Sequence, residues 1–237
     1  MAVAVSFSTA GAQSRDEELF IRPEDQRHLI FGSLEVGRSV FASGGFKQSL
    51  TGSPDRTGFV AVESGGAGIT RERVRLGEES FPATRLTTHS NLLGGHQWSL
   101  PGLFVTALAG FETQHEQLTV DGRVLRFSKP RYGVRAEGEI WSNPTDATLL
   151  TASTVLSSAR GSLWARGSAG VKLGPSIFVG PEVATYVTDT YREWRVGAHL
   201  TGLRAGILQG RLSAGWATSD DRRPGSPYMG ATAWFRL

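Results

Sequence analysis

The chain has 237 residues, of which 39% are hydrophobic and 30 are glycine, and its formal net charge is +3. The apolar share is below the roughly 45 to 50% of globular domains, and glycine exceeds its usual share of about 7%. Basic residues are dispersed, which argues against nucleic-acid binding, and the absence of cysteine excludes disulfides, Cys-ligated zinc and a thiol nucleophile. No run reaches the roughly 18 apolar residues of a membrane-spanning helix.

The first residues resemble the end of a secretory signal. The run from Met1 closes on Ala10-Gly11-Ala12, small residues typical of a cleavage site, although the positively charged start of such a signal is missing. We expect a signal-peptide remnant over residues 1–12 and a flexible periplasmic lead-in over residues 13–27, with a disordered tail as the alternative. Residues 28–237 are expected to form the folded domain.

From residue 28 to the last residue, alternating segments are punctuated by Gly, Pro, Asn and Asp, which is the pattern of strands and turns. Most segments have the roughly 9 to 11 residues that cross a bilayer at a tilt, more than the roughly 5 or 6 of soluble strands. The sequence predicts an all-β fold, a transmembrane antiparallel up-and-down β-barrel of about 12 strands. The predicted strands are 28–36, 39–49, 57–69, 85–99, 103–116, 130–142, 147–158, 163–173, 177–188, 190–204, 207–218 and 228–237.

The connections differ in length between the two ends of the predicted barrel. Tight turns rich in Gly and Pro alternate with longer, charged connections that are predicted as loops at 70–84, 117–129 and 219–227. Outer-membrane barrels have short periplasmic turns and long external loops, so the tight turns are expected to face the periplasm.

The last strand is expected to pair with the first, because a barrel leaves no strand edge unpaired. Its alternation predicts one row of side chains facing lipid, namely Met229, Ala231, Ala233, Phe235 and Leu237, with Trp234 and Arg236 at the periplasmic end of the lumen.

Charged residues fall on one face of several predicted strands. A barrel must turn this face to its lumen, because an Arg facing lipid at the bilayer midplane costs about 2 to 4 kcal/mol. The mixed signs favour ion pairing in a narrow or filled lumen over a selective pore, and a soluble sheet with one solvated face is the alternative. The predicted luminal charge network is Glu112, Arg131, Arg135, Glu137, Glu139, Arg166, Glu182, Glu193, Arg195 and Arg211.

Tryptophan occurs near strand ends, for example at Trp98, Trp141, Trp164 and Trp234. Aromatic girdles at the two membrane interfaces would place tryptophan there, and ordinary packing is the competing interpretation.

No catalytic or metal site is predicted. The five histidines lack metal-ligand spacing, so no metal ion or cofactor is expected. The pairs His89-Ser90 and His115-Glu116 are the starting points for a hydrolase at the barrel rim, but no catalytic residue is assigned and the chain is predicted not to be an enzyme.

One region resembles a known family. Gly180-Pro181-Glu182, followed by Arg195-Val-Gly197-Ala, is similar to the BcsS family of outer-membrane cellulose-biosynthesis proteins, in which a Gly-Pro-Glu strand precedes an Arg-x-Gly-Ala strand. A departure is Gly95-His96-Gln97, where the family pattern has Gly-Tyr-Gln.

The resemblance implies a protein of the cell outer membrane that contacts lipid and lipopolysaccharide. It further implies a non-enzymatic accessory role in cellulose biosynthesis or secretion, in which external loops contact the β-glucan and periplasmic turns face components of the cellulose synthase complex. A small-solute channel and a lipid-modifying barrel enzyme are the alternative functions.

Overall fold

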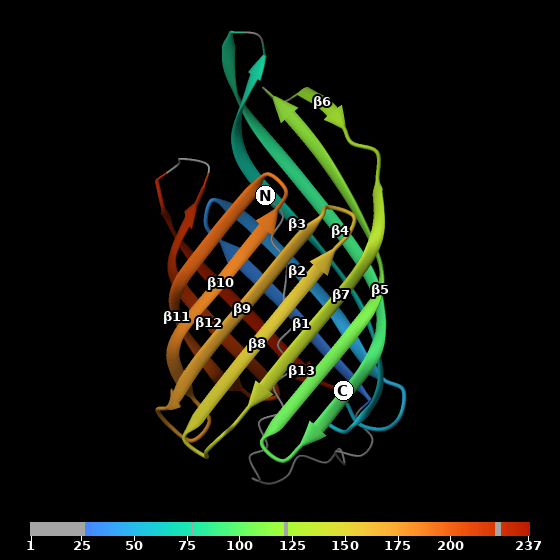
Figure 1. The fold of residues 1–237 in the computed structure, drawn as a ribbon, viewed down its shortest axis with the longest axis vertical. Helices are drawn as coiled ribbons and strands as arrows, with labels where there is room; N and C mark the ends of the chain where they lie inside the picture. The colour runs from blue at the N-terminus through green and yellow to red at the C-terminus, as the bar shows by residue number, and fades with distance from the viewer. Residues whose placement is uncertain (1–26, 77, 121–122, 221–223) are drawn as a thin grey trace.

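The computed structural model describes residues 27–237 except 77, 121–122 and 221–223, and thirteen strands lie in this part of the chain (Figure 1). The predicted signal remnant and, except for residue 27, the predicted lead-in lie outside the described residues. The strands are β1 (His28–Val36), β2 (Ser39–Ser49), β3 (Gly58–Leu76), β4 (Glu79–Leu100), β5 (Leu103–Val120), β6 (Arg123–Phe127), β7 (Arg131–Ser142), β8 (Thr148–Ser157), β9 (Ser162–Lys172), β10 (Phe178–Thr188), β11 (Tyr191–Ala205), β12 (Leu208–Ser219) and β13 (Ser226–Arg236).

Twelve of these strands form a closed antiparallel ring. Sequential neighbours pair around the ring, β5 pairs directly with β7, and β1 pairs with β13 through a register that sets Leu29 opposite Arg236. Strand β6 lies outside the ring and pairs only with the extension of β5. The predicted twelve-stranded barrel and the pairing of the terminal strand are confirmed. In the described part of the chain, no helix is long and apolar enough to cross a membrane.

Three strands continue beyond the ring at one end, here called the arm end. Strands β3 and β4 stay paired as far as Leu76 and Glu79, and β5 continues to Val120 beside β6 (Figure 1). The loops predicted at 70–84 and 117–129 are therefore wrong. Charged and polar residues such as Arg71, Glu72 and Arg73 are frequent in these segments and are also typical of loops, although the apolar Ala83 and Val120 are buried there.

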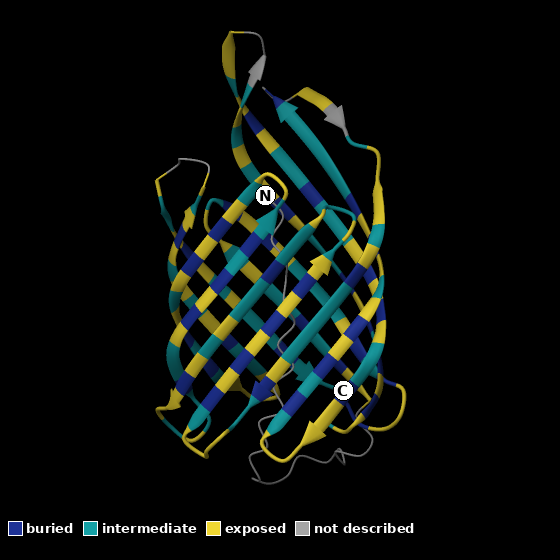
Figure 2. Ribbon diagram, viewed as in Figure 1, coloured by how far each residue is buried: buried dark blue, intermediate teal, exposed yellow. Residues whose placement is uncertain are grey.

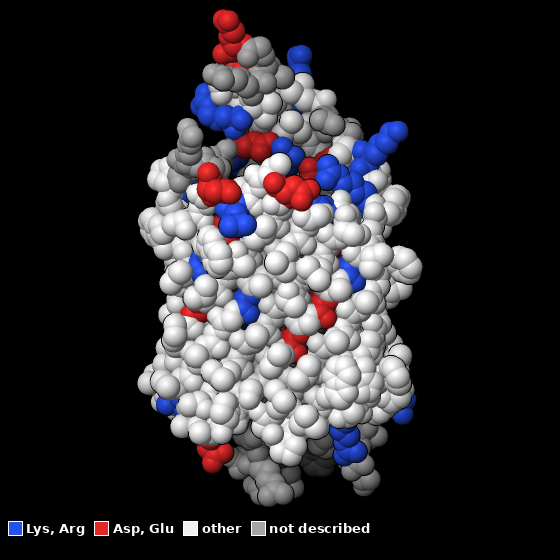
Figure 3. Space-filling view, viewed as in Figure 1, with Lys and Arg blue, Asp and Glu red and all other residues white. Residues whose placement is uncertain are grey.

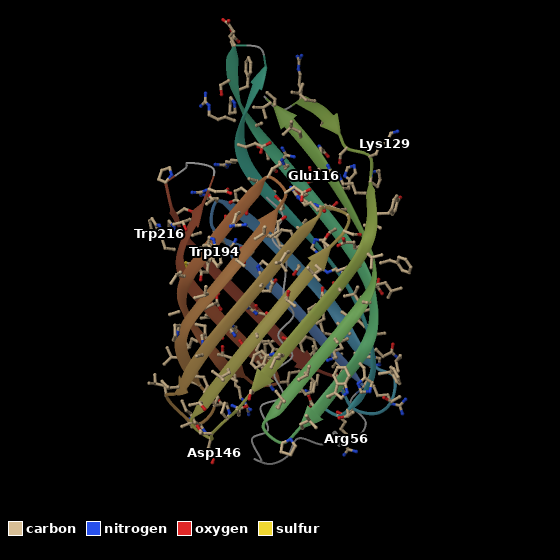
Figure 4. All side chains as sticks on the ribbon, in the orientation of Figure 1. Arg56, Glu116, Lys129, Asp146, Trp194 and Trp216 are labelled. Atoms are coloured by element: carbon tan, nitrogen blue, oxygen red, sulfur yellow. The ribbon has the colours of Figure 1, made fainter. Side chains whose placement is uncertain are left out.

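Three connections at the arm end, 37–38, 158–161 and 189–190, are short, so the predicted difference in connection length between the two ends is not found there. The opposite end, here called the turn end, carries the connections 50–57, 101–102, 143–147, 173–177 and 206–207. The longest of them, residues 50–57, folds against the barrel opening: Gln97 Nε2 donates to the carbonyl oxygen of Pro54 at 2.8 Å, and Asp55 pairs with Arg236 at 2.9 Å. Figure 4 labels Arg56 and Asp146 at this end and Glu116 at the arm end.

The barrel wall alternates between buried and exposed side chains along most strands (Figure 2). On β13, Met229 is exposed whereas Trp234 is fully buried, and Leu237, directly after the strand, is also exposed, in agreement with the predicted faces. The outer flank in Figure 3 is mostly uncharged, and charges gather at the arm end. An apolar outer wall around a charged interior is the pattern of a membrane-spanning barrel.

The girdle interpretation fails for three of the four tryptophans named above. Trp141, Trp164 and Trp234 are buried on the inward face. Each lies an even number of residues from luminal side chains of its own strand and so points the same way, a relation here called strand parity. Trp98 does face outward, together with Trp194 and Trp216, which Figure 4 shows on the outer flank near the arm end.

Candidate functional site

The lumen holds an apolar cluster near the turn end and several groups of charged side chains, and the buried Lys47 lies against the cluster with its Nζ 5.3 Å from the centroid of the Phe104 ring. Near the turn end, large side chains from opposite walls pack together, and the indole rings of Trp141 and Trp234 lie with centroids 6.5 Å apart. The apolar cluster comprises Leu29, Phe31, Phe41, Val60, Val62, Leu93, Phe104, Leu108, Trp141, Leu149, Phe178 and Trp234. Side chains thus span the barrel interior near the turn end.

One group of luminal charges lies on β5 and β7. Arg135 Nε donates to Glu137 Oε1 at 2.5 Å, and its Nη1 lies 3.6 Å from Glu112 Oε2. Glu112 also accepts hydrogen bonds from the Ser157 hydroxyl and from the backbone amide of Ala159. The strand parity of β5 and β7 turns these side chains inward, where each charge has a partner of opposite sign.

A second group connects β1 with β11. Arg195 bridges Glu193 at 2.7 Å and Glu35 at 2.5 Å, and the Tyr191 hydroxyl donates to Glu193 Oε2. Glu35 was not among the predicted network residues. Its parity with Phe31 on the same strand was the sequence signal that would have placed it inside.

The family-like motif is part of a third group. Glu182 accepts from Arg211 at 2.5 Å and from the Tyr228 hydroxyl at 3.4 Å. A Cβ on Gly197 would lie 2.6 Å from that hydroxyl, so glycine leaves the space that Tyr228 occupies. Arg211 also reaches Thr151, four strand positions around the ring.

Pro181 interrupts the ladder between β9 and β10. Neither Gly180 nor Pro181 has a register partner on β9, and proline has no backbone N–H to donate. The carbonyl oxygen of Ala169 on β9 is approached instead by His199 Nε2 at 3.3 Å, while His199 Nδ1 contacts the Thr201 hydroxyl at 2.8 Å. The Gly180-Pro181-Glu182 motif therefore lies beside His199 and contributes Glu182 to the buried ion pair with Arg211.

The remaining predicted charges have other surroundings. Glu139 accepts from Trp141 Nε1 at 2.9 Å, and the half-buried Arg166 lies over the Trp164 ring. Arg131 is exposed and lines a cavity at the arm end, so it lies apart from the buried groups.

A chain of alternating charges crosses the arm end. Arg160 lies 3.0 Å from Glu116, which pairs with Arg85 at 2.9 Å, and Arg85 pairs with Glu72 at 2.7 Å. Burial opposes ionisation of Glu116, but Arg160 and Arg85 together hold the pKa of its carboxyl below the ordinary value. Burial acts in the opposite direction on Arg85, and Glu72 and Glu116 outweigh it and raise the pKa of the guanidinium.

A cavity of about 680 Å³, here called the mouth cavity, lies beside this chain. Tyr186 and Tyr191 contact each other at its edge with ring centroids 6.3 Å apart, and Trp164 and Val155 pack beneath Tyr186. The sequence-based reasoning missed both tyrosines. Their positions on either side of the tight connection at 189–190 were the available signal. The lining is Arg38, Thr70, Arg71, Glu72, Arg131, Arg160, Tyr186, Thr188, Asp189, Thr190, Tyr191 and Pro224.

The two candidate hydrolase pairs are not assembled. His89 is stacked on Phe41 inside the barrel, whereas Ser90 lies on the outer face and hydrogen bonds with Thr113. His115 and Glu116 likewise lie on opposite faces of β5, since Glu116 points to the charge chain. Within the described ranges, no group of three His, Asp or Glu side chains is arranged to hold a metal ion.

Solved structures to which this chain is similar include an autotransporter translocator domain, a porin and an outer membrane protein. The translocator domain of the autotransporter NalP from Neisseria meningitidis is 9% identical with a TM-score of 0.51, and the alignment covers 90% of this chain and 88% of that one. The KdgM porin in complex with disordered oligogalacturonate is 6% identical with a TM-score of 0.48, over 88% and 99%. Omp33 of Acinetobacter baumannii is 12% identical with a TM-score of 0.40, over 91% and 100%.

No curated protein matches the chain significantly. A family model described as cellulose biosynthesis protein BcsS matches residues 29–237, which is the whole barrel from β1 to the last residue. The closed ring, the apolar outer wall and the charged interior are those of a bacterial outer-membrane barrel. The chain therefore belongs to the BcsS family of cellulose biosynthesis proteins and is a twelve-stranded β-barrel of the outer membrane.

Proposed function

We propose that this barrel is a non-enzymatic, non-conducting accessory of cellulose secretion that binds β-glucan in the mouth cavity. The observation that carries the proposal is the contrast between the two ends. The turn end is crossed by contacting side chains such as Trp141 and Trp234, whereas the arm end has a cavity of about 680 Å³ and strands that extend beyond the ring.

The lining of the mouth cavity suits a neutral sugar chain. A pyranose ring has apolar C–H faces, which pack on aromatic rings, and equatorial hydroxyls, which pair with planar polar side chains. The half-buried Tyr191, packed against the buried Tyr186, supplies aromatic surface, and Asp189, Arg71 and Arg131 supply charged hydrogen-bonding groups around it. The arm end then faces the cell exterior, where the polymer emerges, and the turn end faces the periplasm.

Binding of cello-oligosaccharides to the purified full chain in micelles tests the proposal. We expect saturable binding by calorimetry, lost by at least tenfold in Tyr191→Ala and Asp189→Ala. Tyr132→Ala is the matched control, because Tyr132 is also an exposed aromatic residue but lies on the outer wall. Equal loss in the control, or no binding by the wild type, contradicts a glucan site in the mouth.

The cellular test uses a deletion strain complemented with the same variants. Wild type and Tyr132→Ala are expected to restore extracellular cellulose yield and fibril organisation, and Tyr191→Ala is not. Unchanged cellulose in the deletion strain would overturn the accessory role itself, independently of where the glucan binds.

A further inference from the structure

One carboxylate points outward from the middle of the barrel wall. Glu63 on β3 is exposed, whereas its neighbours Val62 and Ser64 are buried in the lumen. Along the outer row of the same strand, Phe59 lies four residues towards the turn end and Ile69 six residues towards the arm end, and both are at least half exposed. At about 3.3 Å per residue on a tilted strand, Glu63 lies near the centre of an apolar band about 25 Å tall.

The side chains across the two neighbouring strands are apolar. Phe46 on β2 and Leu92 on β4 are the register partners of Glu63, and both are exposed on the outer face. In the described chain, Glu63 has no ion pair or hydrogen bond through its side chain, and no other Asp, Glu, Lys or Arg points outward within the band. The nearby polar pair differs, since Ser90 and Thr113 hydrogen bond to each other at 3.0 Å.

The outer surface beside Glu63 also has a position without a side chain. Gly94 lies on the outer face of β4 opposite Ala61, and a Cβ placed on it would meet no atom within 4 Å. Packing inside the barrel therefore does not require glycine there, although glycine weakens a strand interior. Glycine at such a position marks a place where another backbone approaches closely.

We infer that the outer face of β2–β4 around Glu63 docks a second membrane-spanning protein that carries a Lys or Arg side chain at mid-depth. An unpaired carboxylate in hydrocarbon is costly, and a cation is the partner that offsets this cost most strongly through a charge-assisted hydrogen bond. A second copy of this chain does not supply that charge, because its described outward side chains in the band include no Lys or Arg. Lipid head groups lie at the membrane surfaces, about half the band height away.

Photo-cross-linking in the native outer membrane tests this interface. A photoreactive amino acid replaces Leu92, the register partner of Glu63, and a control replaces Val183, which is exposed on β10 at the opposite side of the ring. We expect a protein adduct at 92 and none at 183. The cross-linked peptide should contain Lys or Arg, and Glu63→Leu should reduce the adduct at least tenfold while Glu63→Asp retains it.

The stability of the isolated barrel separates docking from a structural role. Without its partner, Glu63→Leu is expected to unfold at the same or a higher urea concentration than the wild type, because it removes the carboxylate from the apolar band. No adduct at 92, an adduct between two copies of this chain, an adduct insensitive to Glu63→Leu, or a destabilised Glu63→Leu barrel would each overturn the inference.

Discussion

Trp141 and Trp234 meet edge to face inside the barrel, with ring centroids 6.5 Å apart and planes at 66°, although their strands lie on opposite sides of the ring. Strands β7 and β13 are six positions apart in either direction around the twelve strands. The two indoles therefore bridge the full width of the lumen. They lie within the apolar cluster near the turn end.

The contact between the two indoles should be measurable as an energetic coupling. Trp141→Ala and Trp234→Ala are each expected to lower the free energy of unfolding by about 3 to 5 kcal/mol. The double variant should lose about 0.5 to 1.5 kcal/mol less than the sum, since an aromatic pair contributes that much beyond its buried area. Urea unfolding of all four proteins in lipid vesicles measures this cycle, and strict additivity would show that the rings do not interact.

The buried pair of Arg211 and Glu182 should be more sensitive to loss of one partner than of both. Arg211→Met is expected to destabilise the barrel by about 3 to 5 kcal/mol, because Glu182 is left as an unpaired buried charge. Adding Glu182→Met should recover most of the loss. A double variant as unstable as the sum of the two single variants would contradict the pairing.

Two glycines of the barrel wall should respond in opposite ways to alanine. Gly197→Ala places a Cβ 2.3 Å from the carbonyl oxygen of Ala214, a backbone contact that no rotamer relieves, so a loss of about 1 to 3 kcal/mol is expected. Gly94→Ala meets open space and should be neutral or stabilising by about 0.4 to 1 kcal/mol in the isolated barrel. Unfolding midpoints of equal value for both variants would show that the space at Gly197 is not needed.

The charge chain at the arm end should weaken in acid. Arg160 and Arg85 lower the pKa of Glu116 against the effect of burial. The contribution of the charge chain to the stability of the protein is therefore complete above the ordinary carboxyl pKa of about 4.5. It is lost as pH falls through the lowered pKa of the folded state. The chain has no cysteine, so a single cysteine at Thr84 can carry a spin label on the extended part of β4.

Label mobility measured by electron paramagnetic resonance is expected to rise as the pH falls below about 4.5 in the wild type and to change little in Glu116→Gln. The same acid transition in both proteins, or greater mobility at higher pH, would contradict the role of Glu116.

The strand pattern was predictable because the outer wall is apolar and the lumen polar, which imposes a period of two. Strands β1 and β2 were predicted with the bounds that the structure shows, and β7 to β13 within about two residues. Residues 70–76 and 79–84, which continue β3 and β4 beyond the ring, were missed because their charged and polar residues are also typical of external loops.

The contacts inside the lumen were less predictable than its charges. Parity alone turns Arg195 and Arg211 inward, but their partners Glu35 and Thr151 come from strands that only the closed ring brings within reach. The tryptophans show the same limit. A strand end near a membrane interface suits both an outward Trp98 and an inward Trp234. The curvature of the barrel decides which aromatic side chains meet.

Planar-bilayer conductance of the purified full chain tests the closed lumen most directly. The contact of Trp141 with Trp234 and the paired charges beyond it predict no steady current at 100 mV in either polarity. The double variant Trp141→Ala with Trp234→Ala, which removes the contact between opposite walls, is expected to show at least intermittent openings. Stable ohmic current steps from the wild-type protein would contradict the closed lumen and favour a small-solute channel.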